Sequence, residues 1–196
     1  MSDKILILTS VNKLNGGVGQ IYLDRLVQHL DNPTINRYLP VTNIFKGYIG
    51  KAVTKLFLIS KILGVIELLI DMIRILYTLV KIDKNKKILV TLSSRLLIRS
   101  SFFILYFKPK CKLSVIVWDH PAYIFYYNTK RYEWVNYLDK KIASHVLKNC
   151  KFAITMGKKM DDELFKISHS TIKTLHIKSA LQKNNLRMLI FLYFDG

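Results

Sequence analysis

The sequence predicts an α/β protein built around a doubly wound parallel sheet, with helices on both of its faces. Short apolar runs that are typical of buried strands alternate with longer runs of helical periodicity. Parallel neighbours need crossover connections, and those crossovers cover the sheet. A chain of 196 residues with 51% hydrophobic content can also bury the core that such a domain needs.

Strand and helix follow one another along most of the chain. The predicted strands are residues 4–8, 37–41, 88–92, 112–118, 152–155, 171–177 and 186–193. The predicted helices are residues 18–30, 51–82, 95–107, 132–147 and 158–167. We expect one Rossmann-like domain over residues 1–180, and a hinge with the first strand of a second domain over residues 181–196. Ligands of such a sheet gather at the carboxyl ends of its strands.

The most apolar region, residues 51–82, would need about 18 consecutive residues without charge to cross a bilayer. Charged side chains interrupt it at Lys55, Lys61, Glu67, Asp71, Arg74 and Lys81. Several of them fall on one helical stripe and leave a wide apolar face, which predicts an amphipathic helix or a pair of helices hinged at Gly64. Two interpretations stay open. The apolar face packs against the sheet inside the domain, or spare apolar area lies on a membrane surface beside Lys51, Lys55 and Lys61.

The chain is strongly basic, with 31 Lys and Arg against 13 Asp and Glu and a formal charge of +18. This charge attracts nucleic acid, anionic lipid or phosphorylated small molecules without choosing among them. The aromatic and basic cluster at residues 123–134 can stack nucleobases, but it can equally cover a sugar ring or a lipid linker. No RNA-recognition signature accompanies it, so we do not expect a nucleic-acid partner.

Neither cysteine, Cys111 or Cys150, has a His or Cys neighbour at metal-ligand spacing. We therefore expect two reduced, structural thiols and no metal. Residues 1–4 lead directly into the first predicted strand, without the pattern of a secretory signal. A cytoplasmic location is the expectation.

The loop after the first predicted strand carries two adjacent glycines, Gly16 and Gly17, and Val18 then opens a helix. Adjacent glycines let the backbone approach a bound group closely, and the helix that follows points free N–H groups at it. This arrangement suits a phosphate. The pattern is neither the dinucleotide fingerprint nor a P-loop, so a plain tight turn is the alternative.

Asp119 and His120 directly follow the predicted strand that ends at Trp118. This is where a doubly wound fold holds its working residues. An imidazole there can donate a hydrogen bond to a sugar hydroxyl or a departing phosphate, and Asp119 can orient it or accept a proton from an acceptor hydroxyl. The alternative is a histidine that packs in a loop beside Pro121.

Four segments in this order resemble the amino-terminal domain of family 4-like glycosyltransferases, which have the two-domain GT-B fold. They are Lys-Ile-Leu-Ile-Leu-Thr-Ser at 4–10, Gly-Gly-Val-Gly at 16–19, Val-Trp-Asp-His-Pro at 117–121 and Ala-Ile-Thr-Met-Gly-Lys-Lys-Met at 153–160. The resemblance covers about the whole chain. It implies that Gly16, Gly17 and Val18 lie against the donor diphosphate or the acceptor, and that His120 lines the cleft near the donor sugar with Asp119 beside it.

The same resemblance implies that Thr155, where the family more usually has a serine, borders the donor and acceptor site before the crossing to a second domain. In the family that second domain carries a basic pair and two glutamates eight positions apart. The glutamates of this chain are Glu67, Glu133 and Glu163, and none are so spaced. A natural truncation, a split enzyme with a separate donor subunit, and an inactive relative are all open.

We therefore expect the acceptor-binding half of a glycosyltransferase that moves a sugar from a nucleotide sugar to a hydroxyl acceptor in polysaccharide biosynthesis. The resemblance implies retention at the anomeric carbon, and the nucleotide sugar is a substrate, so no cofactor is expected. The alternative is a non-catalytic basic module that docks on a partner subunit or on an anionic membrane. That module would sit peripherally on the inner face of the membrane.

Overall fold

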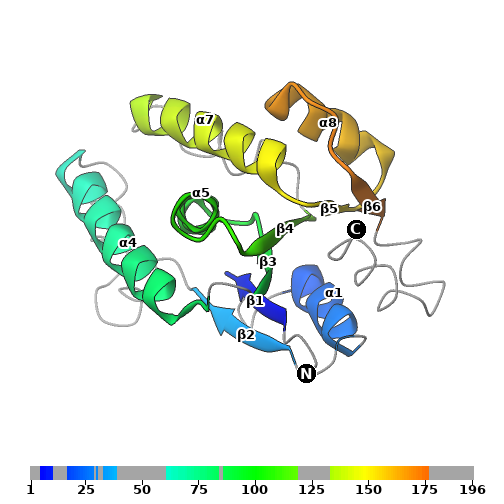
Figure 1. The fold of residues 1–196 in the computed structure, drawn as a ribbon. Coiled ribbons are helices and arrows are strands. Elements are labelled where there is room, and N and C mark those ends of the chain that lie inside the picture. Colours follow the sequence, from blue (N-terminus) through cyan, green and yellow to red (C-terminus); the bar gives the residue numbers. More distant parts are fainter. Residues whose placement is uncertain are drawn as a thin grey trace.

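The computed structural model describes residues 5–10, 17–28, 30, 33–38, 61–83, 86–118 and 133–176. Within these ranges the chain forms a six-stranded sheet of order β2-β1-β3-β4-β5-β6, in which every neighbouring pair is parallel. Helices cover the sheet on both faces (Figure 1). The predicted α/β, doubly wound, Rossmann-like fold is confirmed. Residues 181–196, with the predicted hinge and last strand, lie outside the described residues.

The strands are β1 (Ile5–Thr9), β2 (Thr34–Arg37), β3 (Lys87–Thr91), β4 (Lys112–Val117), β5 (Ala153–Thr155) and β6 (Thr174–His176). The described helices are α1 (Gly17–Gln28), α4 (Lys61–Lys81), α5 (Arg95–Phe107), α7 (Glu133–Asn149) and α8 (Lys158–Ser168). The second strand starts and ends earlier than the predicted 37–41, because its pairing with β1 runs from Thr34 to Arg37.

The direction in which the chain adds each new strand to the sheet decides which face the connecting helix covers. α1 connects β1 to β2 at one edge of the sheet, and all later connections run the other way, from β2 across to β6. Parallel crossovers are right-handed, so this reversal puts α1 on one face and α4, α5, α7 and α8 on the other. Figure 1 shows α1 alone on its side among the described helices.

Side chains alternate between the two faces along each strand and build two buried cores. Leu8, Val90 and Val115 point into the core under α4, α5 and α7. The other core lies under α1 and consists of Ile7, Leu23, Leu26, Leu30, Leu89, Ile116, Phe152, Ile154 and Leu175. The central strand β3 is buried over its full length, as expected for a parallel strand with helices on both sides.

Local signals fix several helix ends. Ser94 caps α5: its backbone is extended and its side chain accepts a hydrogen bond from the Leu97 N–H at 3.4 Å. Gly157 precedes α8 with a φ of 152°, a backbone conformation that favours glycine. His169 ends α8 in the left-handed region, with a φ of 52°.

A buried ion-pair network joins three helices on the larger face. The guanidinium of Arg99 in α5 donates to Asp139 of α7 through Nε at 2.8 Å and Nη2 at 2.9 Å, and to Asp71 of α4 through Nη1 at 3.2 Å. Arg95 adds a contact of 3.4 Å to Asp139. The three side chains of Arg99, Asp71 and Asp139 are all buried.

α4 packs against the domain with only part of its apolar face. Its polar residues Asp71 and Thr78 are buried, and only one edge of the apolar face, with Ile75 and Leu79, joins the core. Leu68, Ile70 and Met72 are partly buried. The exposed apolar side chains of the helix are Val65, Leu69, Ile73, Leu76, Tyr77 and Val80. Among the residues described, no helix combines the length and hydropathy needed to cross a bilayer.

Candidate functional site

The sheet has a topological switch point between β1 and β3. From β1 the chain moves outward to β2, whereas from β3 it moves to β4 on the opposite side. The helices that follow these two strands, α1 and α5, therefore lie on opposite faces (Figure 1). Doubly wound proteins bind ligands in the crevice that this divergence leaves at the carboxyl ends of the strands.

A cluster of hydroxyl groups occupies the carboxyl ends of β1 and β3. The Thr91 hydroxyl donates to Thr9 Oγ1 at 3.1 Å and lies 3.0 Å from Ser93 Oγ. Ser93 Oγ in turn lies 2.7 Å from Ser10 Oγ. The two threonines are fully buried, while the two serines are partly exposed. A chain of hydroxyls thus leads from the interior of the sheet to its surface, and each hydroxyl can both donate and accept. We call these four residues the hydroxyl cluster.

Strand register extends the polar character of this edge to β2. Arg37 pairs with Thr9 at the end of β2, and Thr9 and Thr91 occupy the same level of the neighbouring strands β1 and β3. The same row continues as Ile116, Ile154 and Leu175 on β4, β5 and β6. The row is therefore polar beside the switch point and apolar beyond it.

Arg37 contributes an unsatisfied cationic group to this row. Its Nη1 atom is buried and has no hydrogen-bond partner within the described ranges. A buried guanidinium nitrogen without an acceptor is costly, so this atom favours an anion or a water as its partner. Arginine is also the side chain best suited to bind a phosphate through two parallel hydrogen bonds.

The amino termini of α1 and α5 both open at this edge. Neither helix has an acidic residue in its first turn. Ser94 accepts from the Leu97 N–H of α5, but no acidic side chain of either helix neutralises the positive end of the helix dipole there. By contrast, α8 carries Asp161 in its first turn. Anion binding at the carboxyl edge is thus favoured beside the switch point rather than beside α8.

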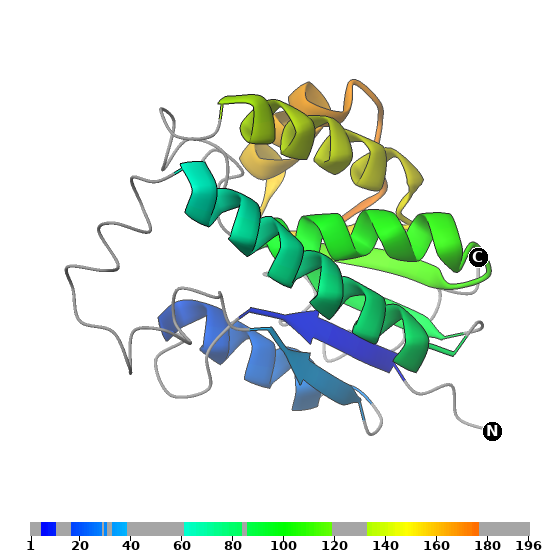
Figure 2. The ribbon, with the colours of Figure 1, turned by 90° about the vertical axis from the view of Figure 1, so that its left-hand side faces the viewer.

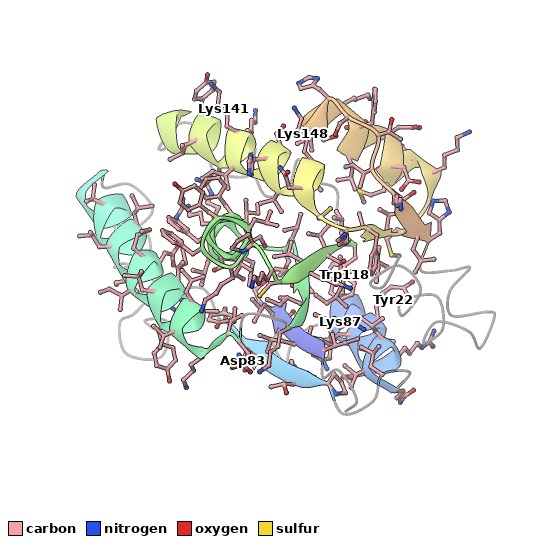
Figure 3. All side chains as sticks on the ribbon, in the orientation of Figure 1. Tyr22, Asp83, Lys87, Trp118, Lys141 and Lys148 are labelled. Atoms are coloured by element: carbon pink, nitrogen blue, oxygen red, sulfur yellow. The ribbon has the colours of Figure 1, made fainter. Side chains whose placement is uncertain are left out.

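The predicted site residues fall partly within this region. Gly17 and Val18 form the start of α1, whereas Gly16, Asp119 and His120 lie outside the described residues. Trp118, which precedes Asp119 in the sequence, is partly buried at the carboxyl edge of β4 and packs on the α1 side of the sheet (Figure 3). Because β1 and β4 point the same way, the chain leaves both strands at the same edge.

Thr155, the remaining predicted site residue, belongs to a second polar cluster at the end of β5. Its hydroxyl donates to Asp161 Oδ1 at 2.7 Å. The other carboxylate oxygen, Oδ2, accepts from Thr174 at 3.0 Å and lies 2.7 Å from His176 Nε2. Burial raises the pKa of Asp161, but the hydrogen bonds from His176, Thr155 and Thr174 outweigh burial and hold it below its ordinary value.

Sequence reasoning did not find Arg37, Ser93 or His176 as site candidates. Ser93 follows a strand end, so the same positional rule that singled out His120 could have found it. No sequence signal places Arg37 or His176, because their neighbours are set by strand pairing across the sheet. Within the described part of the chain, no group of three or more His, Cys, Asp or Glu side chains is arranged to hold a metal ion.

The fold and the polar carboxyl edge place this chain among doubly wound α/β proteins. No protein-family model, no curated protein and no solved structure matches it.

Proposed function

We propose that this chain is the acceptor-side half of a glycosyltransferase, and that it moves a sugar from a nucleotide sugar to a hydroxyl acceptor. The observation that supports the proposal is the convergence of the hydroxyl cluster, Arg37 and the amino termini of α1 and α5 beside the switch point. A donor of this class carries a diphosphate, which needs N–H donors and positive charge. It also carries a sugar, which needs groups that donate and accept hydrogen bonds.

The role that we propose for each residue follows its position along the carboxyl edge of the sheet. The start of α1, with Gly16, Gly17 and Val18, faces the diphosphate, and Arg37 with the hydroxyl cluster supports its charge. Asp119 and His120, which follow Trp118 in the sequence, supply the groups that act near the transferred sugar. His120 donates a hydrogen bond to the departing phosphate or a sugar hydroxyl, and Asp119 orients it or accepts the proton of the acceptor hydroxyl. Thr155 borders the site on the β5 side, and retention at the anomeric carbon is the expected stereochemistry.

A complementation assay tests the proposal with the protein in its own cells, which supply any partner that holds the donor domain. Extracts of cells that lack the gene are compared after it is restored as wild type or as His120→Ala. Radiolabelled UDP-glucose, UDP-N-acetylglucosamine and GDP-mannose are the probes, and label in polymer and lipid fractions is the readout. We expect incorporation of at least one label to return with the wild type and to fall about 100-fold or more with His120→Ala.

Lys166→Ala is the matched control, because Lys166 is exposed on α8 and its partner Glu163 lies on the same helix. It should restore incorporation fully. If no label depends on the gene, sugar transfer is the wrong function. If label returns but His120→Ala stays within about twofold of the wild type, sugar transfer stands and the role of His120 is wrong.

A second candidate function is a non-catalytic module that docks on a partner subunit or an anionic membrane. The exposed apolar side of α4 favours this alternative. If the chain is such a module, restoring the gene would leave the incorporation of every labelled sugar unchanged. The chain would still be recovered with its partner or with membranes.

A further inference from the structure

The outward side of α4 is apolar over most of the helix. Six side chains form this side, each between 49% and 84% exposed: Val65, Leu69, Ile73, Leu76, Tyr77 and Val80. Their spacing of three and four residues aligns five of them in one row along about 22 Å of helix, with Tyr77 beside it. Single exposed apolar residues are ordinary on protein surfaces, but a continuous stripe marks an interaction surface. We call these six residues the outer face of α4.

The polar bonds of the helix hold the outer face toward solvent. Asp71 accepts from the buried Arg99 of α5, and the Thr78 hydroxyl lies 2.5 Å from that of Tyr38 next to β2. Rotating the helix to hide its apolar side would break both contacts and leave Arg99 without one of its carboxylates. An amphipathic helix normally turns its apolar side inward, so an exposed apolar stripe of this length favours a partner that removes it from water.

The place of α4 in the fold leaves the outer face accessible. α4 is at the end of the helix layer, where it packs against α5 on one side. Figure 2 looks directly at this flank and shows α4 in the foreground, in front of the sheet and of α5. Within the described part of the chain, the outer face is therefore exposed from Val65 to Val80.

Charge selects the kind of surface that fits. Among the exposed side chains of α4 that the structure describes, none is acidic, and Lys81 holds its ammonium 4.2 Å from the centre of the Tyr77 ring at one end of the outer face. The sequence from Leu39 to Ile66, which leads into and begins the helix, has no Asp or Glu and four basic residues: Lys46, Lys51, Lys55 and Lys61. Two copies of a chain with a formal charge of +18 repel each other, whereas an anionic lipid surface attracts it.

We propose that α4 lies in the interface of an anionic membrane, with its outer face among the acyl chains and Lys81 at the level of the headgroups. Helices with one apolar side and basic residues along its border bind membranes in this way, without spanning them. Tyr77 has the amphipathic ring that suits the boundary between headgroups and acyl chains. This surface is separate from the hydroxyl cluster, so the inference does not depend on sugar transfer.

Vesicle sedimentation tests the proposal. The probes are vesicles of phosphatidylcholine alone and of phosphatidylcholine with 30 mol% phosphatidylglycerol, in low salt and in 0.5 M NaCl. We expect the full chain to sediment with the anionic vesicles, and added salt to weaken binding because it screens the attraction. The double variant Ile73→Glu with Val80→Glu should bind at least tenfold more weakly.

The charge-matched control is Ile21→Glu with Phe165→Glu, because both residues are exposed but lie on α1 and α8. This control should bind within about twofold of the wild type. Circular dichroism confirms that each variant is folded. If both double variants lose vesicle binding equally, net charge alone drives binding. If the α4 variant binds as well as the wild type, the outer face does not contact the membrane. Either outcome overturns the proposal.

A dye placed at a single site distinguishes the membrane from a second copy. Val80→Cys and, as control, Phe165→Cys are labelled with an environment-sensitive fluorophore, since Cys111 is buried and the pKa of Cys150 is raised by burial to about 12. The emission at position 80 should shift to the blue when anionic vesicles are added, and that at position 165 should not. A blue shift that grows with protein concentration in the absence of lipid would instead show that a second copy covers α4.

Discussion

The network around Arg99 offers the sharpest test of how the helix layer is held together. Asp139 is fully buried and accepts two hydrogen bonds from Arg99, at 2.8 Å and 2.9 Å. Asp139→Asn keeps the shape of the side chain but removes its charge, and it turns an amide N–H₂ toward a guanidinium that can only donate. Arg99 then keeps one carboxylate, Asp71, at 3.2 Å.

Removing one partner of a buried ion pair lowers the free energy of unfolding by about 3–5 kcal/mol, because the remaining charge is buried without compensation. We expect a loss of this size for Asp139→Asn. With an m value of about 2 kcal/mol/M in urea, this corresponds to a fall of roughly 1.5–2.5 M in the unfolding midpoint. Asp71→Asn weakens the longer contact to Arg99, at 3.2 Å, and should lower the free energy of unfolding by less, about 1.5–3 kcal/mol. Urea unfolding followed by circular dichroism measures both variants.

The matched control is the pair of Lys166 and Glu163, which is as short, at 2.7 Å, but exposed. Lys166→Gln should leave the midpoint unchanged within error, because water and salt screen the pair. Replacing Arg99, Asp139 and Asp71 together by Met, Leu and Leu should recover most of the stability lost in the single variants. If Asp139→Asn lowers the free energy of unfolding by less than about 1 kcal/mol, the buried ion pairs of Arg99 do not hold α4, α5 and α7 together as argued.

Three further predictions concern single residues. The folded pKa of Asp161 lies below that of the unfolded chain, so its contribution to stability is complete above the unfolded value near 4 and is lost as the pH falls through the folded value. The stability difference between wild type and Asp161→Asn, measured by urea unfolding, should be constant above about pH 5 and shrink below about pH 4; a constant difference would contradict it. Burial raises the pKa of Cys150 to about 12, so iodoacetamide at pH 8 should modify it at least ~100-fold more slowly in the folded chain than in urea, by mass spectrometry. Equal rates would be incompatible with that burial. Gly157→Ala should cost about 1–3 kcal/mol although nothing lies within 4 Å of the added methyl, because the φ of 152° is open to glycine alone; a neutral result in thermal unfolding would show that this backbone relaxes freely.

Much of the fold was predictable because it rests on periodicity. The strands 88–92, 112–118 and 152–155 were found within a residue or two, since both of their faces are buried and each sequence is mostly apolar. β2 was placed too late, because three of its four residues are polar and the strand is defined by its pairing with β1. Its polar end is the part of the strand that joins the candidate site.

The orientation of α4 could not be predicted from amphipathicity. The polar stripe with Asp71 and Thr78 would ordinarily face water, and only the positions of Arg99 and Tyr38 show that it faces inward. Both partners are distant in sequence, and a helical wheel carries no information about them. The candidate site has the same property: Ser10 and Ser93 are neighbours because their strands pair, although 83 positions separate them in the chain.

The most direct test of the proposed site is a titration of the ¹⁵N-labelled chain with UDP and GDP, followed by the backbone amide signals. A nucleoside diphosphate at the switch point should shift the amides of Gly17 and Ser93, and Arg37→Gln should weaken its binding about tenfold, the loss of roughly 1.4 kcal/mol. Lys87 and Lys112, at the opposite edge of the sheet, should not respond. Shifts confined to that opposite edge, or no shifts at millimolar ligand, would contradict a phosphate site at the carboxyl ends of β1 and β3.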